Sequence, residues 1–240
     1  MNKLFGLKFY GKQLNSIVED LHDEIENNKK VSVFTPNIDH IINNYDDKYA
    51  NKRYCESEYT IADGWPLVVV GKIKKINITR ITGVDLMDEL LKLSNENGYR
   101  VFFLGATDET LIVLKEEIKS QYPNIGEISY HNGYFTDNES VINKINQTRN
   151  NILFVGMGNP KQEIWIRENC EKLNCNVMIG VGGAFKIFSK EVERAPKLVQ
   201  AIGMEWFYRF LKEPKRLFGR YFVKYPRFIK IMFKELSVNG

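Results

Sequence analysis

The stretch Asn151-Ile-Leu-Phe-Val-Gly-Met-Gly-Asn-Pro-Lys-Gln-Glu163 runs from an apolar segment through two glycines into a helix start. Residues 152–155 are apolar at every position, which is typical of a strand buried on both faces of a parallel sheet. Gly156 and Gly158 allow the backbone to turn sharply and to approach a ligand closely. The stretch therefore predicts a strand–turn–helix unit with a binding site at the turn.

The helix start carries residues that suit a capped N-terminus. Asn159 fits the N-cap, Pro160 the first helical position, and Gln162 the reciprocal capping position. Free backbone N–H groups and the positive end of the helix dipole would then face a ligand, and phosphate is the natural one. Lys161 supports this hypothesis, because a cation at a helix start opposes the dipole. A junction without a ligand is the alternative, and the missing third glycine disfavours a standard NAD site.

Predicted strands and helices alternate along the rest of the chain. Strands are expected at residues 31–34, 59–62, 100–104, 127–130 and 177–181. Helices are expected at residues 12–28, 39–45, 82–95, 108–121, 138–147 and from the glycine turn to residue 173. This alternation predicts an α/β fold with a Rossmann-like, mostly parallel sheet flanked by helices. Ligands of such sheets bind beyond the carboxyl ends of the strands.

Polar residues follow three more of the predicted strands. Gly105-Ala-Thr107 forms a tight turn at a strand end, and its first and last residues are candidates for the donor site. Thr35-Pro-Asn37 offers a hydroxyl and an amide to a sugar, although Asn37 could simply cap a helix. Asp63, in Ala-Asp-Gly-Trp, is either part of an Asp-Gly turn or a catalytic carboxylate beside Trp65, an aromatic platform for a sugar ring.

Composition bounds the class of protein. The 240 residues, 43% of them hydrophobic, suffice for a substantial core in one large domain or two joined lobes. Cys55, Cys170 and Cys175 are sparse and odd in number, which favours core thiols in a reducing compartment. The chain shows no signal peptide and no apolar run near the roughly 18 residues of a membrane span. We expect a cytoplasmic protein without cofactor or metal, because no Asp-x-Asp element, triad or metal cluster is present.

Positive charge is concentrated at the C-terminus. Residues 194–240 hold 11 Lys/Arg and three acidic residues, a net of +8, whereas the preceding 193 residues have a net of −4. Apolar and basic residues alternate there at helical spacing, and Pro214 and Pro226 should divide the run into two or three short helices. We expect a body at 1–195 and, at 196–240, an amphipathic helical appendage on an anionic membrane surface. A helix pair docked on the body is the alternative, and no module for nucleic-acid binding is present.

Several motifs occur in the order of one known family. They are Thr35-Pro-Asn37, Ala62-Asp-Gly64, Ile81-Thr-Gly-Val-Asp85, Phe103-Leu-Gly-Ala106, Gly156-Met-Gly-Asn-Pro-Lys-Gln-Glu163, Val181-Gly-Gly-Ala-Phe185, Arg194-Ala-Pro196 and Glu205-Trp-Phe-Tyr-Arg209. Together they resemble the WecG/TagA/CpsF family of bacterial glycosyltransferases over nearly the whole chain. The resemblance implies that a sugar, such as an N-acetylhexosamine, passes from a UDP-sugar to a polyprenyl-diphosphate-linked sugar with inversion and without metal. It further implies a role in teichoic acid, enterobacterial common antigen, capsule or exopolysaccharide synthesis at the inner face of the membrane.

The resemblance also implies roles for single residues. The family's proposed catalytic base corresponds to Asp63, and further catalytic or substrate-contacting residues correspond to Thr35, Asn37 and Arg80. Residues implied at the donor are Gly156, Gly158, Asn159, Lys161, Gln162, Glu163, Gly105 and Thr107. Residues implied at the diphosphates and the membrane are Arg209, Arg216 and Arg220. Lys186 stands where family members often have an aspartate, which leaves the donor sugar open.

Two other functions remain compatible with the sequence. A nucleotide-dependent oxidoreductase would bind NAD(P) in preference to UDP. A non-catalytic protein that binds membranes or polyanions would release no UDP from any UDP-sugar. A homo-oligomer is also compatible with the sequence.

Overall fold

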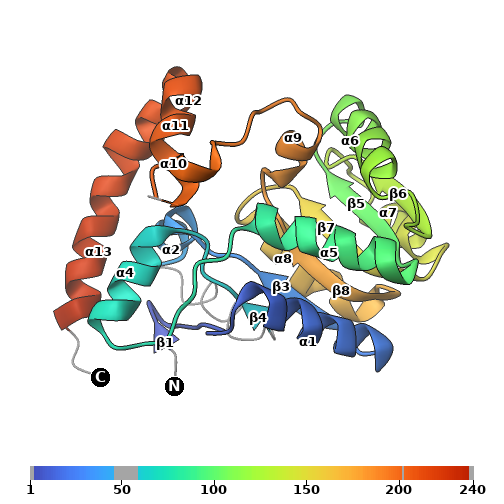
Figure 1. Cartoon of the computed structure of the whole chain (residues 1–240), viewed down its shortest axis with the longest axis horizontal. Helices are drawn as coiled ribbons and strands as arrows, with labels where there is room; N and C mark the ends of the chain where they lie inside the picture. Colours follow the sequence, from blue (N-terminus) through green and yellow to red (C-terminus); the bar gives the residue numbers. More distant parts are fainter. Residues whose placement is uncertain (1–2, 46–58, 202, 238–240) are drawn as a thin grey trace.

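The computed structural model describes residues 3–45, 59–201 and 203–237, so Cys55 lies outside the described residues. Its centre is a six-stranded sheet in the order β4-β3-β8-β7-β5-β6, in which all neighbouring strands are parallel (Figure 1). The strands are β3 (Val31–Phe34), β4 (Tyr59–Thr60), β5 (Arg100–Gly105), β6 (Glu127–His131), β7 (Asn150–Gly156) and β8 (Cys175–Gly180). A short antiparallel pair, β1 (Lys3–Leu4) and β2 (Leu7–Lys8), precedes them. The predicted α/β fold is confirmed.

Helices cover both faces of this sheet and build a separate hydrophobic cluster on each. One cluster contains α1 (Leu14–Glu26), α5 (Gly83–Asn97), α6 (Asp108–Gln121) and α9 (Ala184–Phe188). The other contains α2 (Ile38–Asn44), α4 (Trp65–Ile73), α7 (Asn138–Asn146), α8 (Lys161–Asn169) and α13 (Tyr225–Ser237). A 3-10 turn (Cys170–Lys172) follows α8. Alternate residues of β5 serve the two layers, because successive strand residues point to opposite faces.

Local sequence explains how two of the helices begin. The Thr82 hydroxyl accepts a hydrogen bond from the Asp85 N–H at 3.1 Å, and α5 starts at the next residue as predicted. Asn37 caps α2 in a capping box with His40. The capping interpretation of Asn37 is therefore confirmed, and it places the Asn37 side chain at the end of β3.

The start of α8 differs from the prediction. The helix begins at Lys161, and Pro160 rather than Asn159 occupies the N-cap position, without a side-chain cap. Gln162 is not a reciprocal capping residue, because its side-chain oxygen Oε1 accepts hydrogen bonds from the N–H groups of Gly158 and Gly182 instead. These tertiary partners outcompete the local capping pattern. The helix α4 was not predicted, because its run of three valines shows no helical period.

The described part of the appendage is entirely helical apart from short links. It consists of α10 (Lys197–Ala201), α11 (Glu205–Lys212), α12 (Pro214–Phe218), a π-helical turn (Gly219–Lys224) and α13. Pro214 separates α11 from α12 as predicted. Pro226 makes no break, since it lies in the first turn of α13, where a proline is tolerated. No described helix is long and apolar enough to cross a bilayer.

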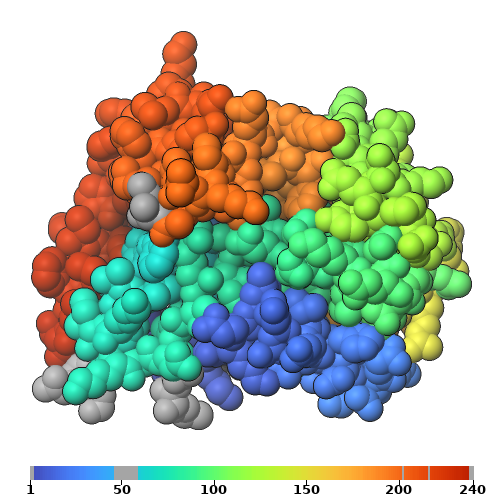
Figure 2. All heavy atoms as spheres, in the orientation of Figure 1, coloured from blue at the N-terminus to red at the C-terminus, as the bar shows by residue number. Residues whose placement is uncertain are grey.

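The appendage packs closely on the body. Phe228 and Ile231 of α13 are buried in the cluster that also contains α2 and α4. The ring of Phe228 lies 5.6 Å from that of Phe5, near the N-terminus. In the space-filling view the orange and red residues of the appendage form one surface with the cyan residues of α4 (Figure 2). Helix α13 is thus docked on the body, and the predicted role of the appendage at a membrane stays a prediction.

Candidate active site

Two neighbouring cavities lie among the residues that follow β3, β4, β7 and β8. The polar cavity has a volume of about 530 Å³ and the aromatic cavity one of about 370 Å³. Residues of the polar cavity include Asn37, Asp39, His40, Gly158, Asn159, Gln162, Gly182, Gly183, Arg220 and Lys224. Residues of the aromatic cavity include Asn37, Asp63, Trp65, Arg80, Glu205, Trp206, Arg209, Arg220, Tyr221 and Tyr225. Asn37 and Arg220 line both cavities, so the two cavities adjoin at these side chains.

Asp63 lies in the aromatic cavity, directly after the short strand β4. Its backbone N–H donates to the Pro36 carbonyl at 2.9 Å, which brings the Ala-Asp-Gly and Thr-Pro-Asn motifs together. Burial, opposed chiefly by Arg80 and assisted by Glu205, raises the pKa of Asp63 to about 6. A carboxylate with this pKa is ionised at neutral pH and basic enough to accept a proton.

Arg80 stands beside Asp63 and faces the cavity with Trp65. Its guanidinium forms an ion pair with Glu205 at 3.0 Å and lies 5.9 Å from the centre of the Trp65 ring. Arg80 Nε and Trp65 Nε1 are buried, and neither has a hydrogen-bond partner among the described residues. The Arg80–Glu205 pair also joins α11 of the appendage to the body.

Arg209 and Arg220 bring positive charge from the appendage to the cavities. Arg209 lines the aromatic cavity, and its guanidinium lies 4.0 Å from the position of a Cβ on Gly183, in the polar cavity. Arg220 forms an ion pair with Asp39 of α2, and its Nε donates to the Tyr225 hydroxyl at 3.2 Å. The side chain of Arg216 lies outside the described residues. The predicted roles of all three arginines stay predictions.

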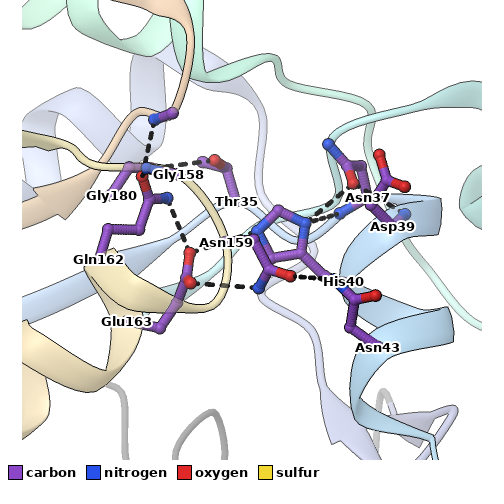
Figure 3. A network of polar contacts seen from close by, with 11 residues as sticks. Thr35, Asn37, Asp39, His40, Asn43, Gly158, Asn159, Gln162, Glu163 and Gly180 are labelled. Atoms are coloured by element: carbon purple, nitrogen blue, oxygen red, sulfur yellow. Dashed lines mark hydrogen bonds and ion pairs between the residues drawn. The ribbon is translucent and has the colours of Figure 1, made fainter. Parts of the chain in front are cut away.

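The glycine turn after β7 is closed by a side chain (Figure 3). Gln162 Oε1 accepts hydrogen bonds from the N–H groups of Gly158 at 3.1 Å and Gly182 at 3.0 Å. Gln162 Nε2 donates to Glu163 Oε1 at 2.7 Å. The two glycine N–H groups are therefore occupied, and the carboxylate of Glu163 lies in the first turn of α8. The predicted phosphate contact at this helix start stays a prediction.

Six predicted site residues, Glu163 among them, line neither cavity. Thr35 donates to the Gly180 carbonyl at 3.2 Å, between β3 and β8. Thr107 caps α6, and Lys161 is exposed. Gly105 and Gly156 lie so close that a Cβ on Gly105 would be 2.5 Å from the Gly156 carbonyl carbon. Gly105 is required by this close approach of the backbone, and Gly156 by the Phe185 ring, which lies 2.7 Å from the position of a Cβ on Gly156.

Some residues of the site were missed by sequence reasoning. Asp39 and Lys224 form an ion pair at 3.0 Å in the polar cavity, and Glu205 binds Arg80. Glu205 opens the motif Glu205-Trp-Phe-Tyr-Arg209, but only Arg209 of that motif was assigned a role. No cluster of three His, Cys, Asp or Glu side chains able to hold a metal occurs among the described residues.

Comparison with known proteins identifies this Rossmann-like protein as a glycosyltransferase. The chain belongs to the glycosyl transferase WecG/TagA/CpsF family, whose family model matches residues 2–239. It is similar to the N-acetylglucosaminyldiphosphoundecaprenol N-acetyl-beta-D-mannosaminyltransferases of Staphylococcus aureus strains MW2, NCTC 8325 / PS 47 and MRSA252. Each is 33% identical over 220 residues, which cover 89% of this chain and 85% of the relative. The family resemblance seen in the sequence is confirmed.

Proposed function

We propose that the protein transfers N-acetylmannosamine, or a closely related hexose, from a UDP-sugar to an N-acetylglucosaminyl-diphosphoundecaprenol acceptor. The names of the staphylococcal relatives support both the transferred sugar and the lipid-linked acceptor. Their match extends over nearly the whole chain, so the body and the appendage are both covered. The product would serve the synthesis of teichoic acid or a related cell-surface polymer.

The observation that carries the proposal is the position of Asp63 in the aromatic cavity. We assign Asp63 as the general base that accepts the proton of the acceptor hydroxyl. As the hydroxyl oxygen bonds to the anomeric carbon, the bond from that carbon to the UDP phosphate oxygen breaks, and UDP leaves with the electron pair. Attack from the face opposite UDP inverts the anomeric centre. One carboxylate is sufficient for this single displacement.

Charge on the departing diphosphate requires cationic partners, because no metal is part of this proposal. Arg209 lines the aromatic cavity and Arg220 lines both cavities, so these two side chains are the candidates. Lys224, paired with Asp39, adds a third cation to the polar cavity. Positioned cations can stabilise developing phosphate charge strongly in a site shielded from water. Side chains rather than the glycine turn would thus carry most of this interaction.

The appendage would hold the enzyme at the cytoplasmic face of the membrane, where the lipid acceptor resides. Exposed large apolar residues are concentrated on it: Trp206, Phe207, Leu211, Phe218, Phe222, Val223, Ile229 and Phe233. Basic residues alternate with them in the sequence. Insertion of the apolar side chains and attraction of the basic ones to anionic lipids would act together.

A screen of donors tests the proposal directly. Purified full-length protein is incubated with a short-chain N-acetylglucosaminyl-diphosphoprenol and UDP-ManNAc, UDP-GlcNAc, UDP-Glc or UDP-ManNAcA, with and without EDTA. We expect UDP release with UDP-ManNAc, unchanged by the chelator. If no donor yields UDP, the proposed transfer is wrong; if another donor is preferred, the assigned sugar is wrong. Loss of activity in EDTA would contradict the absence of metal from the mechanism.

A further inference from the structure

A buried carboxylate, Glu163, joins the two walls of the polar cavity (Figure 3). Its Oε1 contacts His40 Nε2 at 3.2 Å and accepts from Gln162 Nε2 at 2.7 Å. Its Oε2 accepts from Asn159 Nδ2 at 3.1 Å. Glu163 is only 1% exposed and lines neither cavity, so it is not placed to touch a substrate. Its three partners all line the polar cavity.

The geometry indicates that Glu163 is ionised. Burial alone would raise the pKa of Glu163, but the hydrogen bonds from His40 and Gln162 outweigh burial and hold that pKa below its usual value. An ionised carboxylate only accepts hydrogen bonds. Both neighbours must therefore present hydrogens to it, which fixes the orientation of each.

For Gln162, this constraint fixes the side-chain amide. Because Nε2 must point to Glu163, Oε1 points to the N–H groups of Gly158 and Gly182. One amide thereby ties the turn after β7 to the turn after β8. A Cβ on Gly180 would lie 2.7 Å from Gln162 Nε2, so the glycine leaves room for this side chain.

For His40, the same constraint fixes the ring. Nε2 must carry a hydrogen towards Glu163, so Nδ1 of the neutral ring is an acceptor, and it accepts the Asn37 backbone N–H at 3.2 Å. Asn37 lines both cavities and lies one residue after Pro36, which binds the Asp63 N–H. Glu163 thus acts on Asn37 through His40, and on the glycine turns through Gln162.

We propose that Glu163 is a positioning residue for sugar transfer. Through His40 and Gln162 it holds Asn37 and the Gly158 and Gly182 turns in the arrangement that receives the donor; this inference rests on the proposed function. A buried charged carboxylate contributes little net stability, since its desolvation offsets much of its attraction to the hydrogen-bond donors around it. Its presence beneath the cavity is therefore better explained by the orientation it imposes than by the stability it adds.

Glu163→Gln tests the proposal, because the amide keeps the shape but cannot accept from every donor around it. We expect kcat to fall about 10- to 100-fold, as for the loss of an orienting group behind a ligand-contacting residue. Asn169→Ala is the matched control. Asn169 is also buried on α8 and hydrogen-bonded, to Asn138 and the Trp165 carbonyl, but lies at the opposite end of the helix. It should lower the Tm with kcat unchanged.

The other end of the pair supplies a second test that does not depend on Glu163 variants folding. His40→Gln can still donate to Glu163 and should retain most of the activity, whereas His40→Leu cannot and should lose as much as Glu163→Gln. In the full-length wild-type protein, ¹⁵N NMR should show the hydrogen of the His40 ring on Nε2. Calorimetry measures UDP affinity, and it tests the polar cavity without requiring turnover.

The outcomes separate the two proposals. A wild-type enzyme that releases no UDP would defeat the proposed transfer, while the NMR and calorimetric comparisons would still decide the role of Glu163. Wild-type kcat, KM and UDP affinity in Glu163→Gln would overturn the positioning role. The positioning role would also be overturned if Glu163→Gln and Asn169→Ala lowered Tm equally and lowered kcat equally, because Glu163 would then be merely structural.

Discussion

Asp63 combines a carboxylate that must ionise with surroundings that partly resist ionisation. Burial favours its neutral form, and Arg80 favours the charged form. The balance sets the pKa at about 6, close enough to neutrality for the group to accept a proton during the reaction and release it afterwards. These opposing influences come from β4, the segment before α5 and the appendage, which meet only in the folded chain.

Replacing the carboxylate tests this assignment at the level of one residue. In Asp63→Asn the amide cannot act as a base, so turnover should fall about 10²- to 10⁴-fold. UDP affinity should change little, because Asp63 is assigned to the acceptor hydroxyl rather than the nucleotide. UDP release and calorimetry measure the two quantities. Unchanged turnover would show that another group accepts the proton.

The pH dependence offers a second test of the same residue. Only ionised Asp63 can act as base, so kcat/KM should decline below about pH 6, towards tenfold per pH unit. Glu205 raises the pKa of Asp63, so Glu205→Gln should move this decline to lower pH. Rates across pH 4.5 to 8 with intact protein, verified by circular dichroism, give the profile. A decline at the same pH in both proteins would contradict the coupling.

At the scale of secondary-structure elements, α11 has one side at the aromatic cavity and another side exposed. Glu205 and Arg209 line the aromatic cavity, whereas Leu211 of the same helix is 63% exposed. The sequence already showed this amphipathic alternation, since period and charge are local properties. It did not show which side would face the cavity, because that depends on how α11 rests on the Arg80 side chain.

The exposed side of α11 yields a prediction about membranes. Leu211→Glu removes an apolar group worth about 1.5 to 3 kcal/mol when buried and adds a negative charge. Partitioning onto anionic vesicles should therefore weaken about tenfold or more, with little change in Tm. Co-sedimentation with phosphatidylglycerol vesicles measures the effect. Ile112→Glu, 47% exposed on α6, is the control that should bind normally; equal binding of both variants would refute the membrane role.

The turn before α8 shows why an element can be predicted while its chemistry is not. Glycines between an apolar strand and a helix were sufficient to predict the turn. The occupants of its N–H groups were not predictable, since Gln162 reaches Gly182, twenty residues away along the chain. Lys161, which favoured phosphate binding in the sequence, is exposed instead.

At the scale of the whole molecule, α13 is part of the core as well as of the appendage. Phe228 is 5% exposed and packs with Phe5, more than two hundred residues away in the sequence. The ion pair of Lys74 with Glu235, at 3.7 Å, adds a contact between α13 and the segment after α4. Deleting residues 196–240 would therefore expose core residues in addition to removing cationic ones.

This packing predicts that Phe228 contributes to global stability. Phe228→Ala should lower the free energy of unfolding by about 3 to 5 kcal/mol, because it removes a buried aromatic ring and leaves a cavity. Phe233→Ala, 61% exposed on the same helix, should have little effect. Denaturant unfolding followed by fluorescence measures both. Two separate transitions, with only one of them affected, would instead support a body and an appendage that unfold independently.

The sequence alone determined most of the strands and helices of the parallel sheet and its layers, although not α4, and it determined the basic appendage and the family. Periodicity, capping residues and ordered motifs are properties of residues that are close in the sequence, so they can be recognised without knowledge of the fold. Only the tertiary structure decided which of the marked residues meet. It grouped Asp63 with Arg80 and Glu205, buried Glu163 under His40 and Gln162, and gave the glycine N–H groups a side chain as partner. The physical reason is that burial, pKa and hydrogen-bond occupancy depend on groups that become neighbours only through the crossings of the sheet and the docking of the appendage.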